Sequence, residues 1–151
     1  NSEKALKNTS ELFNNIGAKC KENNIQFGYH NHAVEFDKFN GKYAYDILAE
    51  NTVSDLVCLE IDTFWVEYTG LKSVDLMNKY SDRLPLLHIK EMKSLADKRN
   101  TEIGKGIMNF NEIVNLGKKY GTEWFIVEQE YFEIPQLQSI QESLTYLKSI
   151  I

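Results

Sequence analysis

The sequence is poor in several features that mark specialised classes of protein. It has only 2 cysteines and 2 prolines in 151 residues, no secretory leader pattern, and no apolar run near the roughly 20 residues that a membrane-spanning helix needs. Cys20 and Cys58 lie far apart without the spacing of a metal or redox motif, which favours free thiols in a reducing compartment. We therefore expect a soluble, cytoplasmic protein that has no membrane partner.

Basic residues are also in the minority. The chain has 17 Lys and Arg against 22 Asp and Glu, a net charge of −5, which argues against a protein that neutralises nucleic-acid phosphates. Its 42% hydrophobic and 26% charged residues are typical of ordinary globular proteins. A small molecule is therefore the expected partner, and nucleic acid is not.

Apolar periodicity predicts a first helix and then four units of a strand followed by a helix. The first helix is expected at residues 2–23. Strands are expected at 25–32, 56–62, 84–90 and 123–128, with helices at 43–50, 71–80, 110–120 and 136–151. Because a parallel strand pair needs a crossover that returns the chain, this order predicts an α/β fold with parallel strands and outer helices. No G-x-G-x-x-G or P-loop motif opens a helix, so nucleotide-binding versions of the fold lose support.

Titratable side chains gather at the end of every predicted strand. The pairs that share a strand face are His30 with His32, Glu60 with Asp62, His88 with Lys90, and Glu128 with Glu130. In an α/β barrel these ends form the face that holds the active site. Carboxylates crowded there repel one another and lose hydration, so a divalent cation held by Asp, Glu and His is the natural neutraliser.

Each of these residues has a plainer role when it is taken alone. His30 and His32 could be hydrogen-bonded structural histidines, Glu60 an ion-pair partner of Lys90, and Asp62 a loop cap. An acid or a histidine at the same end of four successive strands is harder to explain by packing or solvation. The repetition therefore favours a metal site.

Five short segments resemble, in order and spacing, the xylose isomerase-like barrels, in particular the sugar phosphate isomerase/epimerase proteins related to inosose dehydratase. They are Tyr29-His30-Asn31-His32 with Glu35-Phe36, Glu60-Ile61-Asp62-Thr63-Phe64-Trp65, Leu87-His88-Ile89-Lys90-Glu91, Ile103-Gly104-Lys105-Gly106 with Asn109-Phe110, and Trp124 with Glu128-Gln129-Glu130. The resemblance implies a (β/α)8 barrel, of which residues 1–151 would form a single domain, the C-terminal half. The N-terminal half would be absent from this chain, which begins without Met, and the open strand edges would be covered by a homodimer or by that missing half.

The resemblance also implies one divalent ion, Mn²⁺ or Mg²⁺, with Co²⁺ or Zn²⁺ as alternatives. The metal ligands implied are Glu35, Asp62, His88 and Glu128. The first of these remains open between Glu35 and His30, because the epimerase branch has a glutamate at the strand end where this sequence has His30.

The function implied is isomerisation or epimerisation of a sugar, a sugar phosphate or a keto-cyclitol, by abstraction of a proton next to a carbonyl. The catalytic candidates are Glu128 as base, His30 or His32 as acid, and Lys90 as the cation that stabilises a developing oxyanion. The candidates for substrate binding are Trp65, Glu60, Lys105 and Glu130, and the glycine loop around Lys105 could offer N–H groups to a substrate oxygen or phosphate or be a plain turn. A dehydratase and a non-catalytic sugar-binding fragment are the alternatives. The family's nuclease branch is disfavoured, since it needs more than 3 histidines and a basic surface.

Overall fold

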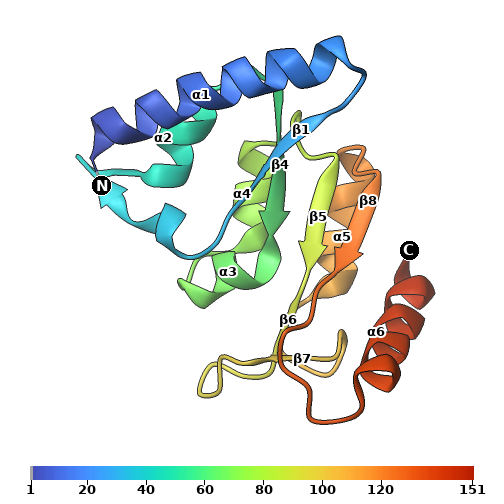
Figure 1. The fold of residues 1–151 in the computed structure, drawn as a ribbon. Helices are drawn as coiled ribbons and strands as arrows, with labels where there is room; N and C mark the ends of the chain where they lie inside the picture. Colours follow the sequence, from blue (N-terminus) through green and yellow to red (C-terminus); the bar gives the residue numbers. More distant parts are fainter. Residues whose placement is uncertain (1) are drawn as a thin grey trace. The chain divides into compact units, whose positions relative to one another are not determined.

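The computed structural model describes residues 2–151 and has an α/β fold built on a parallel four-stranded sheet (Figure 1). The strand order is β1-β4-β5-β8. These strands are β1 (Phe27–His30), β4 (Val57–Asp62), β5 (Leu86–Ile89) and β8 (Trp124–Val127). The predicted α/β class is confirmed, and four parallel strands with helices are consistent with half of a (β/α)8 barrel. No helix among the described residues is long and apolar enough to cross a membrane.

The chain divides into two compact units, residues 1–60 and 61–151, with the boundary inside β4. The helices and short strands of the first unit are α1 (Glu3–Glu22), the 3-10 helix η1 (Val34–Phe36), β2 (Lys38–Phe39), β3 (Lys42–Tyr43) and α2 (Ala44–Glu50). β1 pairs with β4 in a register that sets Phe27 opposite Val57 and His30 opposite Glu60. His30 is thereby placed two residues before Asp62 in the register of the neighbouring strand.

Local sequence signals account for the first unit. The Ser2 hydroxyl accepts a hydrogen bond from the Ala5 N–H at 3.2 Å, so α1 begins where an N-cap residue stands. Phe13 of α1 packs against the rings of Phe27 and Tyr29 of β1, at centroid distances of 5.6 and 5.0 Å. Gly17 lets α1 approach the chain before β4, since a Cβ there would lie 2.2 Å from the Leu56 carbonyl oxygen.

The second unit holds the rest of the chain. Its elements besides β5 and β8 are α3 (Thr63–Tyr68), α4 (Ser73–Lys79), β6 (Glu91–Met92), β7 (Asn100–Thr101), α5 (Phe110–Lys119) and α6 (Gln136–Ile150). β5 pairs in parallel with β8, and α5 lies behind this pair (Figure 1). Leu87 and Ile89 are fully buried on the helix side with Phe110, whereas Leu86 and His88 alternate to the other face. This alternation separates the apolar core from the polar edge.

The structure adds elements that periodicity does not predict. Two short antiparallel pairs form, β2 with β3 and β6 with β7. They lie in segments expected to be loops, except for Tyr43 of β3, which was expected to begin a helix. α3 follows β4 directly, because the Asp62 side chain caps it by accepting a hydrogen bond from the Trp65 N–H at 3.2 Å. Thr63, Phe64 and Val66 are buried, so packing offsets the weak helix propensity of this aromatic and β-branched segment.

Candidate metal centre

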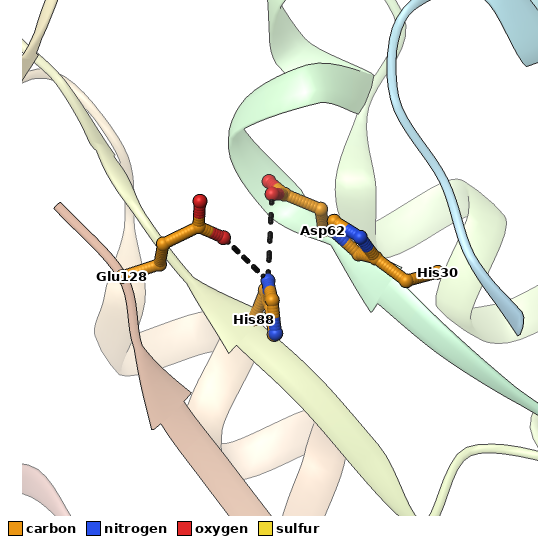
Figure 2. Close-up of side chains that lie close together, drawn as sticks. All are labelled: His30, Asp62, His88 and Glu128. Atoms are coloured by element: carbon orange, nitrogen blue, oxygen red, sulfur yellow. Dashed lines mark ion pairs between the residues drawn. The ribbon is translucent and has the colours of Figure 1, made fainter. Parts of the chain in front are cut away.

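Three of the predicted ligands converge at the carboxyl ends of β4, β5 and β8. His88 Nδ1 lies 2.7 Å from Glu128 Oε2 and 3.7 Å from Asp62 Oδ2 (Figure 2). One ligand atom from each of the three side chains lies within 4.8 Å of the others. An imidazole nitrogen and two carboxylates at this separation form a donor set that suits a divalent cation such as Mn²⁺ or Zn²⁺.

The burial of Asp62 explains why this group favours a cation. Its side chain is 0% exposed, and a buried carboxylate is costly unless it is paired or binds a metal. One of its oxygens accepts the Trp65 N–H of α3, while the other faces the ring of His88. The helix cap therefore fixes the direction in which Asp62 presents its second oxygen.

Lys90 follows His88 on the same face of the chain and is fully buried. Its ammonium lies 2.5 Å from Glu130 Oε2 and 3.3 Å from Glu128 Oε1. The same nitrogen lies 5.2 and 5.1 Å from the ring centroids of Phe64 and Trp65. Glu128 is thus shared between His88 and Lys90, one carboxylate oxygen to each.

The remaining candidates before β4 belong to the unit of residues 1–60. His30 ends β1 and its ring packs 4.8 Å from that of the exposed His32. The buried Glu35 accepts hydrogen bonds from the Tyr29 hydroxyl at 2.6 Å and from the His32 N–H at 2.8 Å. Burial, and then the bond to Glu35, raises the pKa of Tyr29 well above its usual range, so this hydroxyl stays a donor. Both Glu35 oxygens are therefore engaged within their own unit.

Two predicted substrate contacts have other partners. Lys105 forms ion pairs with Glu142 of α6 and, at 3.9 Å, with Glu102. Trp65 is half-buried and packs against Phe64 and Tyr68 at centroid distances of 5.0 and 5.3 Å. The rings of Phe64 and Trp65 therefore lie beside the Lys90 ammonium, and Lys105 pairs with α6.

Glu91 is a residue that sequence reasoning did not single out. It is 0% exposed, and its carboxylate accepts backbone N–H groups of Met92, Met108 and Gly104 at 3.0, 3.0 and 3.1 Å. Burial raises its pKa, and these N–H groups oppose the rise. A Cβ on Gly106 would lie 2.5 Å from Glu91 Oε1. The one available signal is an acid after a strand together with a downstream Gly-x-Gly that can wrap around it.

A comparison with known protein families identifies the family of this chain. The model of the family described as xylose isomerase-like TIM barrel matches residues 1–150. The chain belongs to this family. The resemblance stated from the sequence is thereby confirmed, and the four parallel strands are those of a partial barrel.

Individual relatives of this xylose isomerase-like chain are longer proteins. An inosose dehydratase of Clostridium perfringens is 26% identical over 115 residues, which are 76% of this chain and 37% of that protein. A crystal structure of a sugar phosphate isomerase/epimerase from Parabacteroides distasonis superposes with a TM-score of 0.90 at 30% identity, over 99% of this chain and 54% of that one. A D-tagatose 3-epimerase-like protein, 16% identical with a TM-score of 0.68 and 57% of its length covered, shares the fold. The chain spans about half of the solved relatives and just over a third of the curated one.

Proposed function

We propose that this chain carries the metal-binding half of a divalent-metal-dependent enzyme that moves a proton next to the carbonyl of a sugar or cyclitol. The observation that supports it is the convergence of Asp62, His88 and Glu128 within 4.8 Å in a chain of the xylose isomerase-like family. A bound Mn²⁺ or Mg²⁺ would polarise the carbonyl and acidify the neighbouring C–H. We place this enzyme in the cytoplasm.

His30 is the proposed fourth ligand, in place of Glu35. His30 stands at the carboxyl end of β1 in register with Glu60 of β4, and parallel strands end at the same edge of a sheet. Glu35, by contrast, already accepts two hydrogen bonds in its own unit. We expect His30→Ala to weaken Mn²⁺ binding about tenfold or more, whereas Glu35→Gln lowers thermal stability and leaves the affinity within about twofold. Manganese titration followed by electron paramagnetic resonance measures both, and the opposite ranking would restore Glu35 as the ligand.

The proton-transfer roles are assigned to Glu128 and His32. Glu128 is 30% exposed in its side chain, the most open of the three convergent residues, so it is the proposed base that receives the proton. His32 is exposed just beyond β1 and is the proposed acid. The Lys90 ammonium lies 3.3 Å from Glu128 and would stabilise the negative charge that develops on the substrate oxygen.

Return of the proton to the other face of the same carbon gives epimerisation, and its return to the neighbouring carbon gives isomerisation. Expulsion of a β-hydroxyl gives dehydration instead. The similarity to inosose dehydratase favours dehydration as the second candidate. All three reactions begin with loss of the same C–H proton, so one measurement tests them together.

Hydrogen exchange with solvent is that measurement. The Mn²⁺-loaded chain is incubated in ²H₂O with free ketoses and with a keto-cyclitol, and mass spectrometry detects deuterium uptake or loss of water. We expect exchange that stops on addition of EDTA and in Asp62→Asn, and that persists in Glu133→Gln. A folded, Mn²⁺-loaded chain that exchanges no substrate proton would show that this chain is not the catalytic part.

A further inference from the structure

The carboxyl end of β5 is hydrogen-bonded on both of its sides, and each bond lies beside a proposed metal ligand. On one side the Thr63 hydroxyl donates a hydrogen bond to the His88 carbonyl at 2.9 Å. On the other side the Glu128 N–H donates to the Ile89 carbonyl at 3.2 Å. Successive carbonyls of a strand point toward opposite neighbours, so the two bonds hold the same strand end from its two sides.

The bond from Thr63 is made by a side chain because the backbone leaves the sheet at this point. β4 ends at Asp62 and α3 begins at Thr63, which is 0% exposed. The Thr63 hydroxyl therefore adds one further connection to β5 just beyond the last residue of β4. A buried hydroxyl is costly without a partner, so the bond to the His88 carbonyl also fixes the direction of this side chain.

The backbone of Thr63 is itself held by the start of α4. Ser73 is 0% exposed, and its hydroxyl donates to the Thr63 carbonyl at 3.0 Å. The Ser73 N–H donates to Glu67 Oε1 of α3 at 2.9 Å. Both helices that follow β4 thus contribute to the placement of Thr63, and the hydroxyl is presented to β5 from a buried, hydrogen-bonded segment.

This connection matters for a cation because two of the proposed ligands come from different strands. Asp62 Oδ2 lies 3.7 Å from His88 Nδ1 (Figure 2). Metal–ligand distances in proteins vary by only about 0.2 Å, so a small displacement of one strand end weakens binding. We infer that Thr63 is a positioning residue, whose hydroxyl sets the place of His88 relative to Asp62. The inference rests on the proposed function, since it assigns how that metal centre is held together.

Thr122 offers a matched control at the opposite end of β5. Its hydroxyl donates to the carbonyl of Leu84, two residues before β5 begins, at 2.8 Å. Thr63 and Thr122 therefore make the same kind of bond near the two ends of one strand, and of the two only Thr63 is next to the ligands. A change to valine removes the hydroxyl from either residue and keeps the branched shape of the side chain.

Manganese titration followed by electron paramagnetic resonance tests the inference. We expect Thr63→Val to weaken Mn²⁺ binding about tenfold or more, while Thr63→Ser, which keeps the hydroxyl, stays within about threefold of the parent chain and Thr122→Val within about twofold. Circular dichroism checks that each variant is folded. Unchanged affinity in Thr63→Val, an equal loss in Thr122→Val, or no recovery in Thr63→Ser would each overturn the inference.

Amide hydrogen exchange of the metal-free chain provides a readout that needs no cation. We expect Thr63→Val to speed exchange of the Glu128 N–H about tenfold and to leave that of Trp124, which donates to the Pro85 carbonyl at 3.0 Å near the other end of β5. Thr122→Val is expected to do the reverse. Equal acceleration of both amides in Thr63→Val would indicate general destabilisation and overturn the inference.

The two readouts separate the inference from the proposed function. A parent chain that is folded but binds no Mn²⁺ contradicts the proposed function. The exchange pattern of the metal-free variants then still decides whether Thr63 holds the end of β5, because local opening there depends on the hydrogen bond and not on the cation.

Discussion

We expect Asp62→Asn and Glu128→Gln each to lower the affinity for Mn²⁺ by about 100-fold or more. Removal of a residue that only hydrogen-bonds to a metal ligand already lowers metal affinity about 10- to 100-fold, and these two changes alter the ligands themselves. Each change removes one negative charge from a group whose ligand atoms lie within 4.8 Å. Manganese titration followed by electron paramagnetic resonance measures the affinity, and circular dichroism checks that each variant is folded.

The Asn variant separates metal binding from folding. Asparagine is as good an N-cap as aspartate, so the hydrogen bond from the Trp65 N–H and the start of α3 are retained. Glu133→Gln is the control for the loss of one negative charge, since Glu133, like Glu128, follows β8 but pairs with Lys93. Stoichiometric Mn²⁺ binding that survives both Asp62→Asn and Glu128→Gln would show that these carboxylates are structural and would remove the basis of the proposed function.

Glu91→Gln produces the largest expected loss of stability. The carboxylate accepts three backbone N–H groups at 3.0 to 3.1 Å, and a glutamine can offer an oxygen to only one side while its NH₂ faces a donor on the other. Because a buried N–H group left without an acceptor costs ~1–3 kcal/mol, we expect the free energy of unfolding to fall by about 2 kcal/mol at mildly acidic pH. Urea unfolding followed by tryptophan fluorescence measures it, with the exposed Glu123→Gln as the control.

The pH dependence of this effect has a defined sign. The pKa of Glu91 is raised above 4.5 by burial, so the folded chain binds this proton more readily than the unfolded chain does. The stabilising contribution is fully present below the unfolded pKa and is lost as the pH rises through the raised value. The stability advantage of the parent chain over Glu91→Gln is therefore expected to shrink between about pH 4.5 and neutrality. An advantage that grows over this interval would mean that the N–H groups lower the pKa of Glu91.

The local patterns of the sequence were sufficient to predict most of the helices and strands. α1 begins after Ser2 because a serine hydroxyl caps the free N–H groups of a helix, and β4 is a short apolar run that can be recognised without a distant partner. The sequence also placed Asp62, His88 and Glu128 at strand ends. Because parallel strands end at one edge of a sheet, their convergence could be predicted from spacing alone.

The tertiary structure decided what depends on contacts between distant residues. Glu35 is engaged by Tyr29 and by a backbone N–H, which no spacing rule indicates. Glu91 is buried because the segment up to Met108 folds back over it, and α3 forms because its apolar side chains are buried.

Composition and periodicity thus determined the α/β class, the order of the elements and the residue types at the strand ends. These are local properties of the chain, set by backbone geometry and by the alternation of side chains. Which carboxylates face His88 and which are surrounded by backbone N–H groups, as Glu91 is, was decided only by the fold. Charge compensation depends on distances across the chain, and those distances exist only after the segments have packed.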